Sequence, residues 1–456
     1  MALSTLSINE IANSSASCSV VGSSPVQGGK SSNQGEASAC ERGEVALSGG
    51  EAPSVHSTES LHAPSLAALT GSKVALALIP EKISDDGTIT GGIGHTRSAR
   101  YALQKTAKFA LSSFDTPKNT PFRVMGCLSS LNKGNNDVLI VKGKISDVCH
   151  FKNLQRCGSV WTCPVCSAAI TQQRAKEVIN AQDSHFKNGG QTLMVTLTHS
   201  HKLHDKLINT VPMVSLALQK FRNSRKYKTL LKSLGYSGLV RALEPTYSDN
   251  NGFHVHTHEL LFVKSESLNI KKITDILFEC WSKACKSVGL GAPSRARGVD
   301  VKESFSPSDY LAKFGLEQKW GAGAELVKSH IKSGRASSLT MFDFLRIVQT
   351  TKDDAQKQKY IKLFQEFAYC FYGKRQLYWT NGLKNEFDIV ELTDDEIINE
   401  SLDDAEIVAV VTKFDWLFLR SLAFDVRGSL LRYAELGGAN AVFDYICHLR
   451  SHFNFN

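Results

Sequence analysis

The sequence has no run of apolar residues long enough to span a membrane, although 42% of its 456 residues are hydrophobic. Its first residues, MALSTLSINEIANSSAS, also lack the basic segment and the continuous apolar segment of a secretory signal. We therefore expect a cytoplasmic protein with no membrane partner. In a reducing cytoplasm, the eleven cysteines are expected to serve as metal ligands before they form disulfides.

Aromatic residues are absent from the first hundred positions, and the first one is Tyr101. This part of the chain is rich in Ser, Gly and Ala, as in the stretch SSPVQGGKSSNQGEASA. Such a segment cannot bury enough apolar surface to offset the entropy lost on ordering. We expect residues 1–72 to be disordered and residues 73–96 to complete a tail with one possible docking segment.

Basic residues outnumber acidic ones outside this tail. Residues 1–72 have a net charge of −4, whereas the whole chain has +9, so residues 73–456 have a net charge of +13. A basic body favours polyanionic partners such as nucleic acid.

From about residue 97 the sequence alternates helical patterns with a few strands, which predicts the α+β class. Strands are expected over residues 192–199, 238–247 and 252–262, and an SDNNG turn joins the last two in a predicted hairpin. Helices are expected over residues 98–113, 167–186, 203–233 (one or two helices), 267–289 and 307–316, with a mainly helical part beyond about residue 340. Thr393 and Glu396 have the spacing of a helix capping box.

The stretch CHFKNLQRCGSVWTCPVCSAAI concentrates possible metal ligands. Cys163 and Cys166 form a C-x2-C pair, a spacing that lets one turn present two thiolates to one ion. Cys157 and either Cys149 or His150 can complete a tetrahedral zinc site. Four protein ligands leave no open position, so such a zinc would be structural. The alternative is a group of buried free cysteines beside a tryptophan.

Three histidines occupy alternate positions in GFHVHTHELLF. Side chains alternate between the two faces of a strand, so His254, His256 and His258 share one face. Two or three converging imidazoles suit a divalent metal ion. The alternative for any single strand histidine is a polar group with a hydrogen-bond partner.

The predicted hairpin supplies a further ligand. If its turn centres on Asn250, Glu244 lies opposite His256 and on the same face. A slip of one residue would turn Glu244 away. His199, at the end of the preceding strand, is another candidate. A mixed site of histidine and carboxylate with open positions would polarise an oxygen of a phosphate or carbonyl.

The segment SPSDYLAKFG begins with residues typical of a helix start, because Ser306 suits the N-cap and Pro307 the first helical position. Tyr310 and Lys313 then lie three residues apart on one helical face. A tyrosine phenol can attack a phosphodiester and form a covalent phosphotyrosine, and a nearby lysine can lower its pKa or stabilise the phosphate. The alternative is a core tyrosine beside a surface lysine.

Together these features resemble the replication initiators of rolling-circle plasmids, within the HUH endonuclease superfamily. The resemblance covers about residues 97–400 and is specific because its motifs occur in order. They are RCGSVWTCPVCSAAI, LMVTLTHSH, GLVRALEPTY with GFHVHTHELLF, SDYLAKF, WGAGAELVKSHIKSGR, and FYGKRQLYWTNGLK followed by ELTDDEI.

The resemblance implies an HUH/RRM-like antiparallel sheet flanked by helices, with a zinc knuckle before it. The implied regions are the tail (1–96), a helical and zinc-knuckle region (97–190), an HUH nicking-joining endonuclease core (191–335) and a helical C-terminal region (336–456). It implies a nick at the double-strand origin of a bacterial plasmid, with Tyr310 as nucleophile and Mg²⁺ or Mn²⁺ on the histidines. The implied partners are origin DNA, single-stranded DNA, and a host helicase and polymerase.

Two departures from the family pattern affect the site. The residue between His256 and His258 is Thr257 instead of the usual hydrophobic residue, whereas Val255 makes His254 and His256 an alternative pair. If His256 and His258 form the pair, His254 is an auxiliary or third ligand. Some relatives carry, four positions before the tyrosine, a glutamate that activates water for termination. This chain has Ser306 there, so Glu303 and Glu317 are the remaining candidates for that role.

Basic residues mixed with aromatics predict contacts to DNA. The candidates are Lys374, Arg375 and Lys384 in the C-terminal motif, and Arg225 and Lys226 in a basic stripe. The alternatives are aromatics packed in a core and a solvated basic face. A conjugative relaxase or a single-strand transposase would share the chemistry, and a zinc-dependent DNA-binding regulator would have no catalysis.

Overall fold

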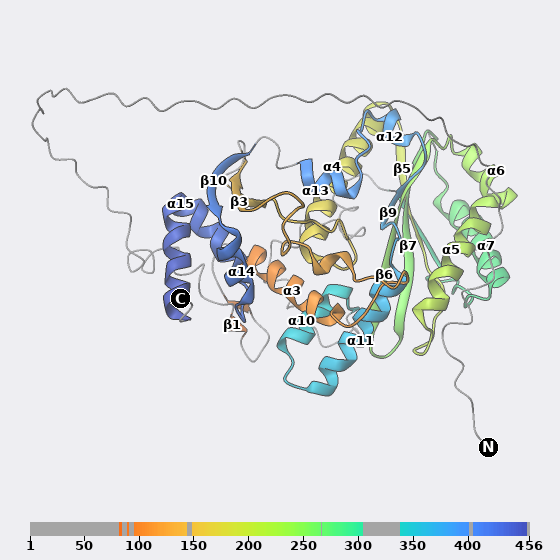
Figure 1. Ribbon diagram of the computed structural model, residues 1–456. Helices are drawn as coiled ribbons and strands as arrows, with labels where there is room; N and C mark the ends of the chain where they lie inside the picture. Colours follow the sequence, from red (N-terminus) through yellow and green to blue (C-terminus); the bar gives the residue numbers. More distant parts are fainter. Residues whose placement is uncertain are drawn as a thin grey trace, which may run out of the picture. The chain divides into compact units, whose positions relative to one another are not determined.

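The computed structural model describes residues 82–83, 89–90, 95–143, 148–265, 267–303, 338–400 and 405–453 (Figure 1). All of them belong to one unit that extends from Leu61 to Asn456. The segment that contains Tyr310 and Lys313 lies outside the described residues, as do Ser306, Glu317 and the tail expected to be disordered.

A five-stranded antiparallel sheet carries the histidines. Its strand order is β8-β5-β7-β6-β9. The strands are β5 (Gln191–Leu197), β6 (Gly238–Ser248), β7 (Gly252–Val263), β8 (Val299–Glu303) and β9 (Leu377–Trp379). The predicted hairpin is confirmed as β6 and β7, and Ser248 pairs with Gly252, so that the turn centres on Asn250. Gly252 has a φ of +76°, and a Cβ there would lie 2.6 Å from the carbonyl oxygen of Leu203, so glycine is required.

Three helices cover one face of this sheet (Figure 1). They are α5 (Leu207–Asn223), α6 (Arg225–Ser233) and α7 (Ile270–Val288). The chain breaks between α5 and α6 at Ser224, whose ψ of 139° is extended and whose side chain accepts a hydrogen bond from the N–H of Tyr227. Residues 203–233 therefore form two helices. Leu193, Val195 and Leu261 face this side and share the main hydrophobic core with α5 and α7.

The opposite face of the sheet carries the histidines, and α4 (Pro164–Lys187) covers one end of it. Ala175, Val178 and Ala181 of α4 share a second core cluster with strand residues that include Leu260 and Phe262. His254, His256 and His258 precede Leu260 on the same face, and they are not part of that cluster. The histidines therefore lie at the end of this face where the α4 cluster does not reach.

A second, three-stranded antiparallel sheet has the order β10-β3-β4. Its strands are β3 (Val138–Lys142), β4 (Cys149–Lys152) and β10 (Glu406–Val411), and α3 (His95–Leu111), α14 (Lys413–Ser421) and α15 (Arg427–His452) accompany them. Arg97 of α3 and Glu435 of α15 form an ion pair of 2.6 Å, in which both side chains are mostly buried. The same glutamate accepts a hydrogen bond from the N–H of Cys149, so α3, β4 and α15 are tied together.

The C-terminal part contains helices and two strands that pair with strands of the N-terminal part. Its further helices are α10 (Met341–Thr350), α11 (Asp354–Cys370), α12 (Leu383–Glu386) and α13 (Asp394–Glu400). The predicted capping box at α13 is confirmed, because Thr393 and Glu396 exchange hydrogen bonds of 2.6 and 3.2 Å. Strand β9 pairs with β6, and β10 pairs with β3, so both sheets cross the expected boundary at residue 335.

The antiparallel sheets and the surrounding helices confirm the predicted α+β class. Short elements complete the described chain, namely β1 (Lys82–Ile83), β2 (Ile89–Thr90) and the 3-10 helix η2 (Arg123–Met125). None of the helices in the described residues combines the length and the apolar character needed to cross a lipid bilayer.

Candidate metal centres

Glu244, His256 and His258 converge on the open end of the sheet. The hairpin register pairs Glu244 with His256, as predicted from the turn. The Nε2 atoms of His256 and His258 lie 3.1 and 2.8 Å from Oε2 of Glu244. Possible ligand atoms of all three residues lie within 4.8 Å of one another. Because strand alternation and cross-strand pairing fix all three side chains, the group is built on rigid elements.

The spacing of these atoms fits one divalent cation. Neighbouring ligands of an octahedral ion at about 2.1 Å lie roughly 3 Å apart, which matches the two N···O distances. The Nδ1 atom of His258 lies 3.0 Å from Oγ1 of Thr196, an outer contact that orients the ring. The side chain of Glu244 is 34% exposed, so an ion held here would retain positions open to solvent or substrate.

The ionisation of Glu244 also suits a metal ligand. Burial acts to raise the pKa of this carboxyl, but hydrogen bonds from His256 and His258 and their charge lower the pKa to about 2. Glu244 is therefore a carboxylate at neutral pH and available as a ligand.

His254 lies beside this group and is not a member of it. Its Nδ1 atom faces Nδ1 of His201 at 2.9 Å, and its ring stacks against the ring of His256 with 4.9 Å between centroids. Burial and the charge of neighbouring histidines lower the pKa of His254 to about 3, so its ring is neutral at pH 7. The sequence singled out His254 as a ligand, but its partner in the structure is His201.

Sequence reasoning did not single out His201. The signal was present in LMVTLTHSH, where two histidines follow the end of a strand. His199 is buried, its ring stacks 5.9 Å from that of His254, and burial lowers its pKa to about 4. A row of five imidazoles therefore runs along this end of the sheet, and it consists of His199, His201, His254, His256 and His258.

A second group consists of four buried thiols, which belong to Cys127, Cys157, Cys163 and Cys166. The Sγ of Cys127 lies 3.8 Å from that of Cys163 and 3.6 Å from that of Cys166, and the Sγ of Cys157 lies 3.7 Å from that of Cys166. Zinc binds thiolates at about 2.3 Å, so the sulfurs of a tetrahedral site are roughly 3.8 Å apart. The geometry therefore fits a closed four-thiolate site.

The expectation that Cys149 or His150 completes this group was wrong, because the fourth thiol belongs to Cys127. Cys149 begins β4, where its backbone pairs with Lys142 and its N–H donates to Glu435. These bonds hold it in the small sheet. Burial raises the pKa of the Cys149 thiol to about 11, which is the behaviour of a structural cysteine.

Neighbouring groups orient the four thiols. The N–H of Cys166 and Nε2 of Gln104 donate to Sγ of Cys163 at 3.4 and 3.1 Å. Hydrogen bonds from the other three thiols hold the pKa of Cys166 well below its usual value, and the buried guanidinium of Arg156 acts in the same direction. Thiolate is the form that binds metal. The amide donors, from Gln104 and from the backbone of Cys166, are typical outer contacts of a metal site.

The basic residues predicted to bind DNA have different surroundings. Lys374 and Arg375 are exposed, and so is Arg225. Lys226 is exposed and pairs with Glu279 at 2.6 Å, an interaction of small energetic value at the surface.

Lys384 is a correction to the predicted set of DNA contacts. It is only 7% exposed, and its Nζ lies 2.8 Å from Oε2 of the buried Glu177. Its ammonium group also lies 5.4 Å from the ring centroid of Trp379. A buried glutamate requires a cation to balance its charge, and Lys384 supplies that cation. Its ammonium group is therefore buried and is not exposed for phosphate contacts.

The chain belongs to the replication protein family, whose match extends over residues 150–420, more than half of the sequence. This match confirms the family resemblance found in the sequence. Both metal-ligand groups fall within the matched range except for Cys127.

Individual relatives are distant. A protein named Protein rep from Streptomyces lividans is 24% identical over 288 residues, which is 51% of this chain and 63% of the relative. Another Protein rep, from Lentilactobacillus hilgardii, is 30% identical over 105 residues, or 22% of this chain and 32% of the relative. A Neomycin resistance protein from Streptomyces cyanogenus is 26% identical over 134 residues, or 24% and 31%. The chain thus spans less than two thirds of the length of these relatives, and no solved structure matches it significantly.

Proposed function

We propose that the chain initiates rolling-circle replication of a plasmid by nicking and joining one DNA strand. The observation that carries the proposal is the convergence of Glu244, His256 and His258 at the uncovered end of an antiparallel sheet. Membership of the replication protein family supports DNA as the substrate.

A divalent ion on these three side chains, Mg²⁺ or Mn²⁺, would supply Lewis-acid polarisation of the scissile phosphate. The chain itself supplies the ligands and their orientation. Glu244 remains ionised, Thr196 orients His258, and the strand backbone prevents the imidazoles from moving apart. Preorganised groups of this kind require no rearrangement during the reaction.

Tyr310 is the proposed nucleophile. Its phenol oxygen bonds to the phosphorus, the bond from phosphorus to the 3′ oxygen breaks, and the proton lost by the phenol is balanced by the proton gained by the leaving 3′ oxygen. The 5′ phosphate stays on the tyrosine, and the freed 3′-OH primes a host polymerase behind a host helicase. A second transesterification reverses the linkage and closes the displaced strand. Lys313 stabilises the phenolate or the phosphate.

The topology is consistent with this assignment. Strand β8 ends at Glu303, seven residues before Tyr310, and β8 pairs with β5, which pairs in turn with the histidine strand. Asp300 lies opposite Thr196, the residue that contacts His258. Glu303 itself lies opposite Leu193, three residues from Thr196 along β5, and the seven residues from Glu303 to Tyr310 span at most about 25 Å when extended. The exposed Glu303 is a candidate to activate water at termination.

The four-thiolate site has a structural part in this proposal. We propose that it holds Zn²⁺ and fixes the start of α4 against the loop after η2, while Lys374, Arg375 and Arg225 contact the DNA backbone. A relaxase or a transposase would use the same chemistry, but the family match favours a replication initiator. The alternative from a different class of protein is a zinc-dependent DNA-binding regulator. The four thiols alone favour it, and it leaves the Glu244, His256 and His258 group without a role.

A nicking assay tests the proposal. Labelled single-stranded oligonucleotides that tile the DNA flanking the gene are incubated with the protein and Mn²⁺. We expect one of them to be cut, and we expect EDTA to abolish cutting. Glu244→Gln and His256→Ala should reduce the cutting rate at least about 100-fold, since each removes a metal ligand.

His254→Ala is the matched control, because His254 lies on the same strand face and outside the ligand group. It should retain most of the activity. Cutting that persists in EDTA, or that survives His256→Ala, would contradict the metal assignment. A protein that binds the oligonucleotides and cuts none of them would instead support the regulator.

A further inference from the structure

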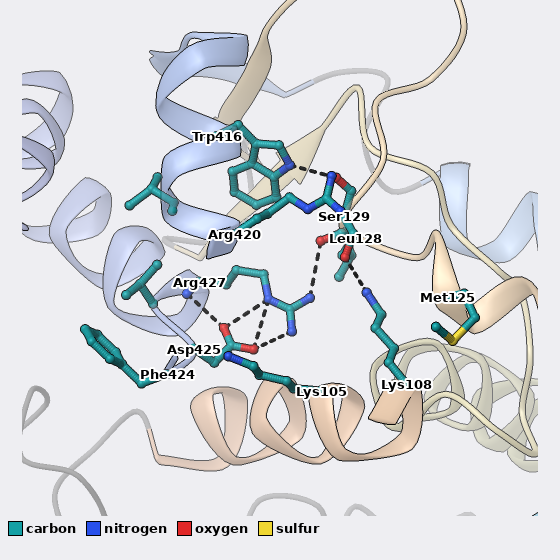
Figure 2. Close-up of a pocket in the computed structure, with 12 residues that line it drawn as sticks. Lys105, Lys108, Met125, Leu128, Ser129, Trp416, Arg420, Phe424, Asp425 and Arg427 are labelled. Atoms are coloured by element: carbon teal, nitrogen blue, oxygen red, sulfur yellow. Dashed lines mark hydrogen bonds and ion pairs between the residues drawn. The ribbon is translucent and has the colours of Figure 1, made fainter. Parts of the chain in front are cut away.

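A pocket of about 280 Å³ lies between α3, the residues that follow η2, and the turn from α14 to α15 (Figure 2). Its basic lining residues are Lys105, Lys108, Arg420 and Arg427, and its acidic lining residue is Asp425. The lining therefore has a net charge of +3. Four of these five residues lie outside the range of the family match, which ends at residue 420.

The two lysines of α3 line the pocket (Figure 2), and each donates hydrogen bonds to oxygen atoms that bear no formal charge. Nζ of Lys105 donates to the carbonyl groups of Leu422 and Ala423 at 2.9 and 2.6 Å. Nζ of Lys108 donates to the carbonyl of Cys127 at 2.6 Å and to the hydroxyl of Ser129. These bonds fix the ammonium groups in place without neutralising them, and the charge of Lys105 also acts on Asp425, the carboxylate of the lining.

The carboxylate of the pocket, on Asp425, already forms an ion pair with Arg427. Asp425 lies 2.5 Å from Nη2 of Arg427, and both side chains are 10% exposed. Arg427 also donates to the carbonyl oxygens of Tyr101 and Leu128, so it forms part of the wall. Arg420 has no hydrogen-bond or ion-pair partner within the described part of the chain, and its side chain is exposed at the mouth.

The excess positive charge carries an energetic cost. Four cationic side chains and one carboxylate line the same pocket of about 280 Å³, so the cations repel one another. The wall is also rigid, because Leu128 has a φ of +50°, a left-handed conformation that is rare for leucine and is maintained here by a 2.8 Å hydrogen bond from its N–H to Gln155. A bound anion would relieve the repulsion among the cations.

We propose that this pocket binds a phosphate group. Lysine and arginine together are the usual ligands of phosphate, whose oxygens accept several charged hydrogen bonds at once. Phe424 lines the pocket and is 45% exposed, so its ring can stack against a base next to the phosphate. The phosphate belongs either to a DNA backbone or to a free nucleotide, and the DNA source rests on the proposed function.

The first arm of the test measures DNA affinity. The full chain and the double variant Lys105→Gln with Arg420→Gln are titrated with a labelled single-stranded oligonucleotide at several salt concentrations. Both substituted side chains are exposed, so the variant should fold. One lost phosphate contact lowers the salt slope by about 0.7 and the affinity at 0.1 M salt about fivefold. The charge-matched control, Lys271→Gln with Lys272→Gln on α7, should show a smaller change.

The second arm identifies the source of the phosphate. The chain with p-benzoylphenylalanine in place of Phe424 is irradiated with the labelled oligonucleotide or with a labelled nucleoside triphosphate. A crosslink to the oligonucleotide, reduced by the double variant, supports a DNA backbone phosphate. A crosslink to the nucleotide alone supports a nucleotide site.

An unchanged salt slope in the double variant together with no crosslink to either probe would overturn the pocket proposal. That result leaves nicking by the unmodified chain unaffected. Conversely, a chain that cuts no DNA but shows the lower slope and the crosslink retains the pocket and loses the proposed function.

Discussion

Cys127 and Cys149 are both buried cysteines, yet only Cys127 faces the other three thiols. Thirty residues separate Cys127 from Cys157, and the contact is formed by the turn after η2. Sequence spacing favoured Cys149 because it lies only eight residues before Cys157. The local sequence does not reveal that the backbone of Cys149 is committed to a strand.

We expect the Cys127→Ser variant to lose its zinc, whereas Cys149→Ser retains it. Replacing a direct ligand should weaken zinc binding more than the 10–100-fold typical of outer contacts. The free energy of unfolding should fall as well, because the folded chain alone binds the ion tightly. Zinc content after gel filtration, measured by mass spectrometry of the metal, checks this. Equal zinc content in the two variants would refute the four-thiolate site.

His199 predicts a pH dependence of stability. Burial lowers its pKa from 6.5 to about 4, so the unfolded chain takes up a proton before the folded chain does as the pH falls. The contribution of the neutral His199 ring to the free energy of unfolding is fully present above pH 6.5 and is lost progressively towards pH 4. The loss of stability should amount to about 2 kcal/mol by pH 5.

The measurement is urea unfolding at pH 7 and pH 5 for the full chain and for His199→Gln, which cannot titrate. The full chain should lose about 2 kcal/mol more than the variant over this interval. An equal loss in both proteins would show that His199 is not buried in its neutral form.

At the scale of elements, the histidine hairpin could be predicted in detail from the sequence. Strand alternation placed the three histidines on one face, and the turn centred on Asn250 brought Glu244 opposite His256. Both signals are local. The pairing of β9 with β6 could not be predicted in this way, because more than a hundred residues separate them and only tertiary packing brings them together.

The buried position of Lys384 has a similar explanation. A basic residue in a motif rich in aromatics predicts DNA contact, and only the fold shows that α12 places it against Glu177 of α4. We expect Lys384→Met to lower the free energy of unfolding by about 3 kcal/mol, because Glu177 loses a buried partner and keeps only Arg174.

The salt slope of DNA binding distinguishes the two roles. It should be unchanged in Lys384→Met and should fall by about one in each of Lys374→Gln and Arg375→Gln, whose side chains are exposed. Unfolding and DNA titration of the three variants check this prediction. A lowered slope with unaltered stability in Lys384→Met would restore Lys384 to the set of DNA contacts.

At the scale of the whole molecule, the range of the family match is not structurally self-contained. Residues 150–420 include the histidine group, but Cys127 and α3 precede that range and α15 follows it. Strand β10 closes a sheet that begins with β3, and Arg97 ties α3 to α15 through Glu435. The parts of the chain on either side of the matched range therefore complete the metal-ligand set and the small sheet.

We propose that a tyrosine of this chain becomes covalently linked to DNA at the Glu244, His256 and His258 group. The most direct measurement is mass spectrometry of the peptide that carries a nucleotide after reaction with Mn²⁺ and digestion of the complex. We expect a 5′-phosphate linkage to Tyr310, and no linkage in the Tyr310→Phe variant. A nucleotide on a different residue, or DNA that is cut without any covalent peptide, would contradict it.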